Sequence, residues 1–312
     1  MKRIILIIAS IVVAAVVLPP LWYVLFPVEL PPELPPAGTS VLLDGGVGLN
    51  VIEAGSGAPV VLVHGLPGSA YDWRELLPQL AARGRRAIAY DRVGYGRSDP
   101  RTNGRFTPEA NAEELLDLLE ALDLTEVTLV GWSYGGMTAM RAALADSSRI
   151  GRLVLVGTSG PDSPDAKPPE LPGFMRVLNS DPVLRWRVAV PSTGVALMKL
   201  SSELAFSGAK QPDWWLSGLR GNFARWETLI AYRSEMGGIG VEPASDAAAF
   251  APETIGSRTL LLHGDNDQLA PVSISRYLNT RIPDSRLVEY PDGSHMLPVT
   301  HAKQMAEQIA EF

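Results

Sequence analysis

Short apolar runs alternate with segments of helical spacing along most of this chain. The run PVVLV, residues 59–63, is apolar at every position, which is typical of a strand that is buried on both faces of a sheet. In the segment 71–84, apolar residues recur every three or four positions, as they do on one face of an amphipathic helix. Because the two patterns keep alternating down the chain, we predict an α/β fold with a mostly parallel central sheet flanked by helices.

The expected elements follow from these patterns. Two short β-rich runs, 41–44 and 49–54, flank GGVG and predict an antiparallel hairpin at the start of the domain. The remaining strands are expected at 59–65, 85–91, 126–131, 152–158, 258–265 and 286–292, and helices at 71–84, 108–124 and 135–145.

One long segment interrupts the alternation of strands and helices. Residues 162–250 are rich in proline at first and then show helical spacing, where a single short crossover would be enough to join the flanking strands. We interpret 162–250 as a helical cap inserted into a core domain made of 41–161 and 251–312. The cap contains four of the chain's seven tryptophans, namely Trp186, Trp214, Trp215 and Trp226.

The first 40 residues differ in composition from the rest of the chain. Lys2 and Arg3 precede a long, uncharged and apolar run, and a helix of about 20 apolar residues is long enough to span a bilayer. We therefore expect residues 1–28 to form a membrane anchor that contacts the membrane over 4–26, followed by a stiff, proline-rich linker at 29–40. The alternative is a cleaved signal peptide, because such peptides share the basic start and the apolar centre.

The basic residues also predict an orientation for this segment. Lys2 and Arg3 lie before the apolar run, and no lysine or arginine follows it until Arg74. Since basic residues flanking a membrane span stay on the cytoplasmic side, we expect the catalytic part outside the cytoplasm. It is either held at the membrane or, if the segment is cleaved, secreted.

The composition argues against several kinds of site. The net charge is −7, which argues against nucleic acid as the main partner. Cysteine is absent, so the chain has no disulfide and no thiolate nucleophile or zinc ligand. The sequence contains no His-Glu-x-x-His, and no Gly-x-Gly-x-x-Gly follows the first strand. We therefore expect neither a metal nor a nucleotide cofactor.

Reactive side chains directly follow three of the expected strands. Ser133 lies in the turn GWSYG, Asp265 and Asp267 lie in HGDND, and His295 lies in PDGSH. Because the carboxyl ends of parallel strands meet at one edge of a sheet, these side chains are expected to lie close together. A serine beside a histidine and a carboxylate predicts nucleophilic catalysis, in which the histidine takes the serine proton.

Taken together, these segments resemble the α/β-hydrolase superfamily, and within it the serine hydrolases with a helical cap. The resemblance covers about residues 40–312 and rests on HGLPGS, YDRVGYGRSD, GWSYGG, HGDNDQLAP and PDGSHMLP, which occur in this order. It implies that Ser133 is the nucleophile, that Asp267 rather than Asp265 is the triad acid, and that His295 is the general base.

Serine hydrolases also need two backbone N–H groups that bind the negative oxygen of the tetrahedral intermediate. One of them is expected at Tyr134, the residue after the nucleophile, and the other in the loop after the first buried strand. Pro67 in this loop has no N–H group. The expected second donor is therefore Leu66.

Three tryptophans are candidate substrate-binding residues. Trp132 precedes Ser133 in the chain, and Trp214 and Trp215 belong to the cap. The cap tryptophans have two interpretations, because such residues can line an apolar pocket for the substrate or simply form the core of the cap. The sequence is compatible with both.

The expected function is hydrolysis of an ester bond in an apolar, small-molecule or lipid-like substrate through an acyl-enzyme. The same triad also suits hydrolysis of a C–C bond, an amide or a thioester, and cofactor-free perhydrolysis of the haloperoxidase type. Serine at position 133 argues against dehalogenase and epoxide hydrolase chemistry, because an alkyl-enzyme requires a carboxylate nucleophile. The alternative outside enzymology is a ligand sensor built on this fold.

Overall fold

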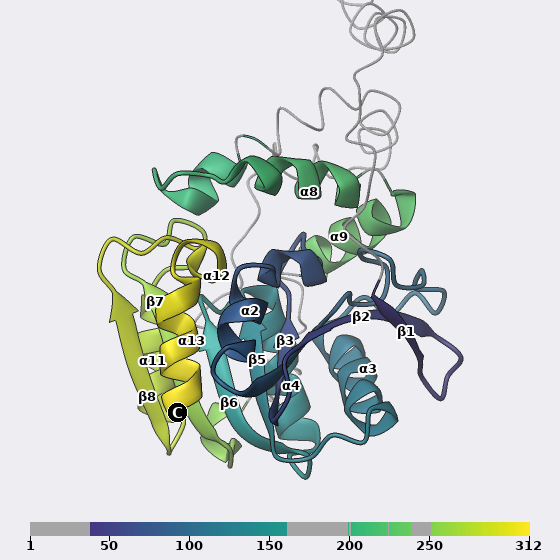
Figure 1. Ribbon diagram of the computed structural model, residues 1–312, viewed down its shortest axis with the longest axis horizontal. Helices are drawn as coiled ribbons and strands as arrows, with labels where there is room; N and C mark the ends of the chain where they lie inside the picture. The colour runs from purple at the N-terminus through teal and green to yellow at the C-terminus, as the bar shows by residue number, and fades with distance from the viewer. Residues whose placement is uncertain (1–37, 161–198, 200, 224, 239–250) are drawn as a thin grey trace, which may run out of the picture.

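A computed structural model describes residues 38–160, 199, 201–223, 225–238 and 251–312 of the chain. An eight-stranded sheet lies at its centre (Figure 1). Its strands are β1 (Thr39–Leu42), β2 (Gly48–Ala54), β3 (Ala58–Val63), β4 (Arg85–Tyr90), β5 (Val127–Trp132), β6 (Ile150–Val156), β7 (Arg258–Gly264) and β8 (Ser285–Tyr290).

The strands are arranged in the order β1-β2-β4-β3-β5-β6-β7-β8. Strands β1 and β2 form the expected antiparallel hairpin, and β2 also runs antiparallel to β4. All the other neighbouring pairs are parallel. The prediction of a mostly parallel sheet is therefore confirmed, and the carboxyl ends of six strands share one edge, where sites in such sheets form.

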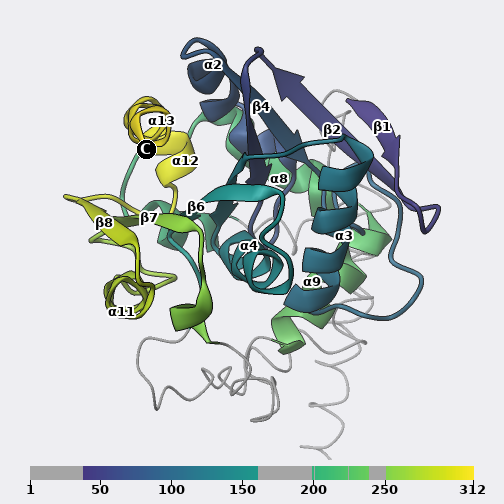
Figure 2. The same ribbon diagram turned by 90° about the horizontal axis from the view of Figure 1, so that it is seen from below.

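Helices flank the sheet on both faces, as Figure 2 shows. The helices that pack on the sheet are α2 (Leu76–Ala81), α3 (Pro108–Ala121), α4 (Tyr134–Ala145), α11 (Ser273–Arg281) and α13 (Ala302–Glu311). Three shorter elements precede α2, β7 and α13 in the chain, namely η1 (Ala70–Trp73), η2 (Pro252–Thr254) and α12 (Leu297–Thr300).

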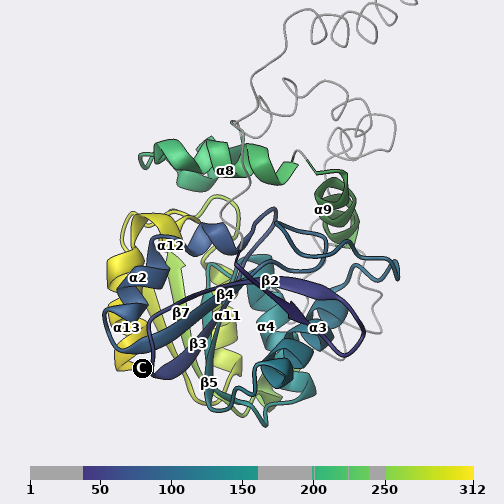
Figure 3. The ribbon, with the colours of Figure 1, turned by 45° about the vertical axis from the view of Figure 1, so that its right-hand side comes forward.

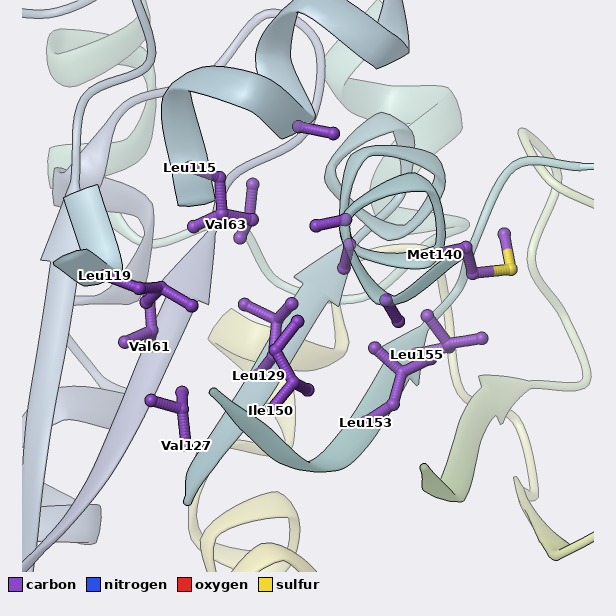
Figure 4. Packing of buried hydrophobic residues seen from close by; sticks show 14 of the residues in the cluster. Val61, Val63, Leu115, Leu119, Val127, Leu129, Met140, Ile150, Leu153 and Leu155 are labelled. Atoms are coloured by element: carbon purple, nitrogen blue, oxygen red, sulfur yellow. The ribbon is translucent and has the colours of Figure 1, made fainter. Parts of the chain in front are cut away.

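Alternate residues of each strand point to opposite faces and build two separate cores. In β3, Val61 and Val63 face α3, α4 and α11, whereas Val60 and Leu62 face α2 and α13. Because helices cover both of these faces, successive residues of β3 from Val60 to Val63 are all apolar. Figure 4 shows the first of these cores, in which Leu115 of α3 and other helix residues pack on the sheet. Each fully buried aliphatic side chain of this kind stabilises the fold by roughly 1.5–3 kcal/mol.

The single helix expected at 71–84 is instead divided into the short element η1 and helix α2. The reason is Pro78, which has no N–H to donate to a residue four positions earlier. In a helix that started near residue 71, Pro78 would interrupt the interior. In a helix that begins at Leu76 it lies in the first turn, where N–H groups have no partner within the helix anyway.

Helices α8 (Asp213–Phe223) and α9 (Trp226–Gly238) lie over the end of the sheet at which the strand-end turns gather (Figures 1 and 3). Both belong to the segment that the sequence assigns to a cap. The Thr228 hydroxyl of α9 donates to the Gly94 carbonyl at 3.1 Å and so attaches α9 to the loop after β4. The expected cap, 162–250, lies partly outside the described residues, and its boundaries stay a prediction.

The expected N-terminal anchor, 1–28, also lies outside the described residues. Within the described part of the chain, none of the helices combines the length and the apolar character needed to cross a bilayer. Strand β1 begins at Thr39, so the end of the linker expected at 29–40 is already part of the sheet.

Candidate active site

Ser133 occupies a strained turn between strand β5 and helix α4. Its φ of 55° and ψ of −122° lie in a region that residues other than glycine rarely adopt, at a cost of about 1–3 kcal/mol. Two glycines make this turn sterically feasible. A Cβ on Gly131 would lie 2.3 Å from the Gly135 carbonyl oxygen, and one on Gly135 would lie 2.2 Å from the carbonyl oxygen of Val63. The strain suggests a function for this serine that a turn residue alone would not need.

The loop after β3 lies directly against Ser133. A Cβ on Gly65 would lie 2.9 Å from the Cβ of Ser133 and 3.5 Å from its Oγ. The two loops can approach this closely only because residue 65 has no side chain. The loop that contains the expected oxyanion donor is thereby brought beside the expected nucleophile.

Asp267 and His295 are in direct contact. The Nδ1 of His295 lies 2.7 Å from the Oδ2 of Asp267, and the Asp267 side chain is completely buried. Its other oxygen, Oδ1, accepts hydrogen bonds from the N–H groups of Leu269 and Ala270 at 2.9 and 2.8 Å. Asp265, the competing carboxylate of the same turn, is exposed. Asp267 is therefore the acid that the structure pairs with His295.

The contacts of Asp267 favour its ionised form. Burial alone would raise the pKa of this carboxyl, but hydrogen bonds from His263 and His295 outweigh it and hold the pKa well below its usual range. The Nε2 of His263 lies 3.4 Å from Oδ2 of Asp267, and its Nδ1 contacts the Ser275 hydroxyl at 2.7 Å. A carboxylate that stays charged fixes the tautomer of His295 and stabilises a positive charge on its ring.

The turn after β6 links Ser133 to the Asp267–His295 pair. The N–H of Ser133 donates to the backbone carbonyl of Val156 at 2.9 Å. The carbonyl of Ser133 accepts from the N–H of Ser159 at 3.2 Å. Between these positions, a Cβ on Gly157 would lie 3.2 Å from Oδ2 of Asp267 and 3.4 Å from Nδ1 of His295. All three expected triad residues therefore border one turn at the carboxyl edge of the sheet.

Trp132, a candidate substrate-binding residue, lies beneath His295. Its side chain is buried, and its indole N–H donates to the backbone carbonyl of His295 at 2.9 Å. The two rings lie 5.6 Å apart between centroids. This contact, which sequence reasoning missed, assigns Trp132 to the support of His295. Contact with a substrate stays a prediction.

Trp132→Phe is expected to lower kcat about three- to tenfold with little change in KM. The substitution keeps an aromatic ring but removes the donor to the His295 carbonyl, a hydrogen bond worth about 0.5–1.5 kcal/mol. Steady-state kinetics on any turned-over substrate measure this. Trp73→Phe is the matched control, because Trp73 is equally buried and its indole N–H has no hydrogen-bond partner among the described residues. Equal losses in both variants would contradict the support role.

The expected oxyanion donors, Leu66 and Tyr134, belong to the two segments that meet at Ser133. Tyr134 is the first residue of α4, and its ring is buried. Leu66 follows Gly65 in the loop after β3 and is joined to Pro67 by a cis peptide bond. The buried ring of His64 organises this loop, because its Nδ1 contacts the Gly65 carbonyl at 2.9 Å and its Nε2 accepts from the N–H of Arg92 at 3.0 Å. Burial and the charge of Arg92 lower the pKa of His64 well below its usual range.

The two cap tryptophans of the site prediction pack in different ways. Trp215 is buried, donates to the Ser202 hydroxyl at 2.5 Å and packs on Phe206. Trp214 is half-buried and packs on Tyr71 of the core domain, with a distance of 5.4 Å between ring centroids. These contacts give both residues a packing role within the described part of the cap. Substrate contact stays a prediction for both.

Asp72 is a buried carboxyl beneath the oxyanion loop that sequence reasoning missed. It is 6 % exposed, and Oδ2 accepts from the N–H of Ser69 at 3.1 Å. A Cβ on Gly68 would lie 2.4 Å from this oxygen. Burial raises the pKa of Asp72 to about 8, with a smaller contribution from the negative charge of Asp91. The sequence offered a weak sign of this burial, since Asp72 lies among apolar residues in YDWRELL.

Asp72→Asn is expected to make stability less dependent on pH. The folded-state pKa lies above the unfolded value, so the neutral carboxyl stabilises the fold fully at low pH, and this contribution is lost as the pH rises toward about 8. Between pH 5 and 8, wild type should lose up to about 4 kcal/mol relative to the variant, because each pH unit corresponds to about 1.4 kcal/mol. Urea unfolding at both pH values measures this. Parallel pH curves would show that Asp72 is ionised in the fold.

The parallel sheet, the strained serine turn and the buried carboxylate–histidine pair together define a hydrolase of the α/β type. A comparison with protein families agrees, because the profile of the "alpha/beta hydrolase fold" family matches residues 58–302. The chain belongs to this family.

Known proteins similar to the chain include two curated bacterial hydrolases. The 2-hydroxymuconate semialdehyde hydrolase of Pseudomonas sp. (strain CF600) is 27% identical over 90% of this chain and 95% of its own length. The 2-hydroxy-6-oxo-2,4-heptadienoate hydrolase of Pseudomonas putida is 29% identical over 87% and 95%. Among solved structures, an esterase from Exiguobacterium antarcticum superposes with a TM-score of 0.71 at 24% identity, over 88% of this chain and 98% of its own. At that identity the structural likeness supports the fold alone.

Proposed function

We propose that this protein is a serine hydrolase that cleaves a carboxylic ester of a small, apolar molecule through an acyl-enzyme. The observation that carries the proposal is the arrangement at the carboxyl edge of the sheet. A serine in a strained turn, a histidine and a buried carboxylate 2.7 Å from that histidine all border the same turn after β6. Each of these groups has one task in acyl transfer.

In the acylation step, Ser133 Oγ attacks the substrate carbonyl carbon, and His295 Nε2 takes the hydroxyl proton. Asp267 keeps Nδ1 of His295 protonated, which leaves Nε2 free to accept. The carbonyl π electrons move to oxygen, and the backbone N–H groups of Leu66 and Tyr134 bind that oxyanion. Collapse of the intermediate expels the alcohol, which leaves with the proton from His295.

In the deacylation step, water attacks the acyl-enzyme and gives a proton to His295. The second tetrahedral intermediate collapses, Ser133 leaves as the free hydroxyl with that proton, and the acid product departs. The N-terminus of α4 directly after Ser133 favours negative charge at the site in both steps.

A second candidate is hydrolysis of a C–C bond next to a carbonyl, with the same nucleophile. The names of the two Pseudomonas relatives favour it, because these proteins are similar to the chain over 87–90% of its length. The two candidates differ in the leaving group, which is an alkoxide oxygen in one case and a carbon in the other. The carbon leaving group must be protonated as it departs, which places a heavier demand on the general acid.

The test is a direct comparison of kcat/KM on two substrates. One is p-nitrophenyl acetate with longer-chain homologues, and the other is 2-hydroxy-6-oxo-2,4-heptadienoate. A kcat/KM at least about tenfold higher on an ester supports the first candidate, and the reverse order supports the second, since tenfold corresponds to about 1.4 kcal/mol of barrier. Turnover of neither substrate, in a protein that a fluorophosphonate does not label, would refute the proposal.

A further inference from the structure

Glu235 of helix α9 is buried among three donors from the core domain. Its side chain is 1 % exposed, and its Oε1 accepts from Arg92 Nη1 at 2.6 Å and from Asn111 Nδ2 at 2.8 Å. Its Oε2 accepts from the Tyr95 hydroxyl at 2.6 Å. A buried carboxylate must be paired in this way, because an uncompensated charge in the interior is strongly destabilising. The position of α9 is therefore linked to that of Arg92.

Arg92 extends this link to the loop beside Ser133. Its guanidinium is 1 % exposed, and Nη2 donates to the carbonyl oxygen of Gly65 at 3.2 Å, while its backbone N–H donates to Nε2 of His64. The guanidinium also lies over the ring of Tyr134, 4.9 Å from its centroid. The Arg92 side chain thus contacts both segments that carry the expected oxyanion donors, the loop after β3 and the first residue of α4.

The Gly65 carbonyl and the Leu66 N–H belong to the same peptide group. That group is planar and trans, so its C=O and N–H point in opposite directions. The carbonyl is held by two donors, Arg92 Nη2 and the Nδ1 of His64. Fixing the carbonyl on one side of the plane fixes the direction of the Leu66 N–H on the other.

We propose that Arg92 is a positioning residue for the oxyanion hole, and that Glu235 couples this arrangement to the docking of cap helix α9. Docking of α9 places Glu235 on Arg92, and Arg92 holds the Gly65–Leu66 peptide in the orientation that binds the oxyanion. This inference rests on the proposed serine hydrolase function. It predicts an effect on the transition state rather than on binding of the ground state.

A second buried pair shows what a purely structural arginine looks like in this fold. Arg101 is also 1 % exposed at its side chain and pairs with Glu114 at 2.6 Å. A second bond joins Nη2 of Arg101 to the other Glu114 oxygen at 2.7 Å, and Nη2 also donates to Oδ1 of Asn111 at 2.9 Å, so Arg101 reaches the Glu235 network through Asn111. It makes no hydrogen bond to the Gly65 carbonyl, which makes Arg101→Met the matched control.

The experiment compares wild type, Arg92→Met, the double variant Arg92→Met with Glu235→Gln, and Arg101→Met. The single variant leaves the Glu235 carboxylate buried without its partner and can unfold for that reason. The double variant removes both charges, so it is expected to fold even if the single variant does not. Each protein is assayed for kcat and KM on p-nitrophenyl acetate. Each is also assayed for inhibition by a trifluoromethyl ketone, which forms a tetrahedral adduct with the serine, and by the corresponding methyl ketone.

Loss of Arg92 should lower kcat about 10- to 100-fold and KM by no more than about threefold, since removal of a whole oxyanion donor lowers kcat by about 10²–10³. Affinity for the trifluoromethyl ketone should fall by the same factor as kcat, while affinity for the methyl ketone stays near that of wild type. Arg101→Met should lower the melting temperature. It should leave the ratio of the affinity for the trifluoromethyl ketone to the affinity for the methyl ketone unchanged.

The inference is overturned if the Arg92 variants lower only the melting temperature and keep the wild-type kcat and ratio of affinities. The same holds if Arg101→Met shifts that ratio as much as they do. A different failure belongs to the proposed function. If a fluorophosphonate does not label Ser133 in the wild type, then no acyl-enzyme forms, and the proposed function falls together with the positioning role.

Discussion

Ser133→Ala should abolish labelling by a fluorophosphonate probe and lower kcat/KM by at least about 10⁴-fold. The probe reacts with a serine whose proton can be taken by a neighbouring base. The structure brings the expected base and acid together, with Nδ1 of His295 2.7 Å from Asp267. Ser133 carries its hydroxyl in the strained turn after β5, and it borders the same turn after β6 as the Asp267–His295 pair. Any remaining turnover would come from the oxyanion hole and from substrate binding.

The measurement is gel-based detection of the labelled protein, together with hydrolysis of the best substrate found. Ser148→Ala is the control. Ser148 is an exposed serine just after helix α4, so this substitution removes a hydroxyl away from the site. Wild-type labelling in that variant shows that the probe is selective. If Ser133→Ala were labelled as strongly as wild type, the nucleophile would be another residue, and the strained turn would need a different explanation.

The sequence predicted the sheet well because the pattern that identifies its strands has a direct physical cause. Strands such as β3 pack against helices on both faces, so every position is apolar and the run stands out. The grouping of the strand-end turns can also be predicted from the sequence. In a parallel sheet the carboxyl ends of the strands lie at one edge, whatever the conformation of the loops. Helix α11 was not predicted, because it buries only Ile274, Ser275 and Leu278 on an otherwise polar surface.

Contacts between distant segments could not be predicted from the sequence. Glu235 and Arg92 are 143 positions apart, and neither lies in a local pattern that indicates its partner. Similarly, nothing in GWSYG indicates that the indole of Trp132 would support the carbonyl of His295, 163 positions away. Such pairings depend on the three-dimensional path of the chain. The sequence therefore indicates only that Trp132, next to Ser133, lies near the expected substrate site.

Asp267→Asn should lower kcat by about 10³–10⁴-fold while the fold and the position of the side chain are kept. The reason is the direction of its hydrogen bonds. Oδ1 accepts from the N–H groups of Leu269 and Ala270, so an asparagine must place its oxygen there and its NH₂ group toward His295. That NH₂ can only donate, which forces Nδ1 of His295 to accept and moves the ring proton to Nε2. In the proposed mechanism Nε2 takes the Ser133 proton, and an Nε2 that already carries a proton cannot do so.

Single-turnover kinetics and the labelling rate measure this loss, with Asp265→Asn as the control from the same turn, because Asp265 is exposed. The pH dependence of stability gives an independent check. Since the pKa of Asp267 is lowered in the fold, its charge stabilises wild type above the unfolded value near 4, and this contribution is lost as the pH falls through the folded value. The stability difference between wild type and Asp267→Asn should therefore shrink below about pH 4. A difference that is constant with pH, together with full activity of the variant, would mean that Asp267 neither carries the charge nor orients His295.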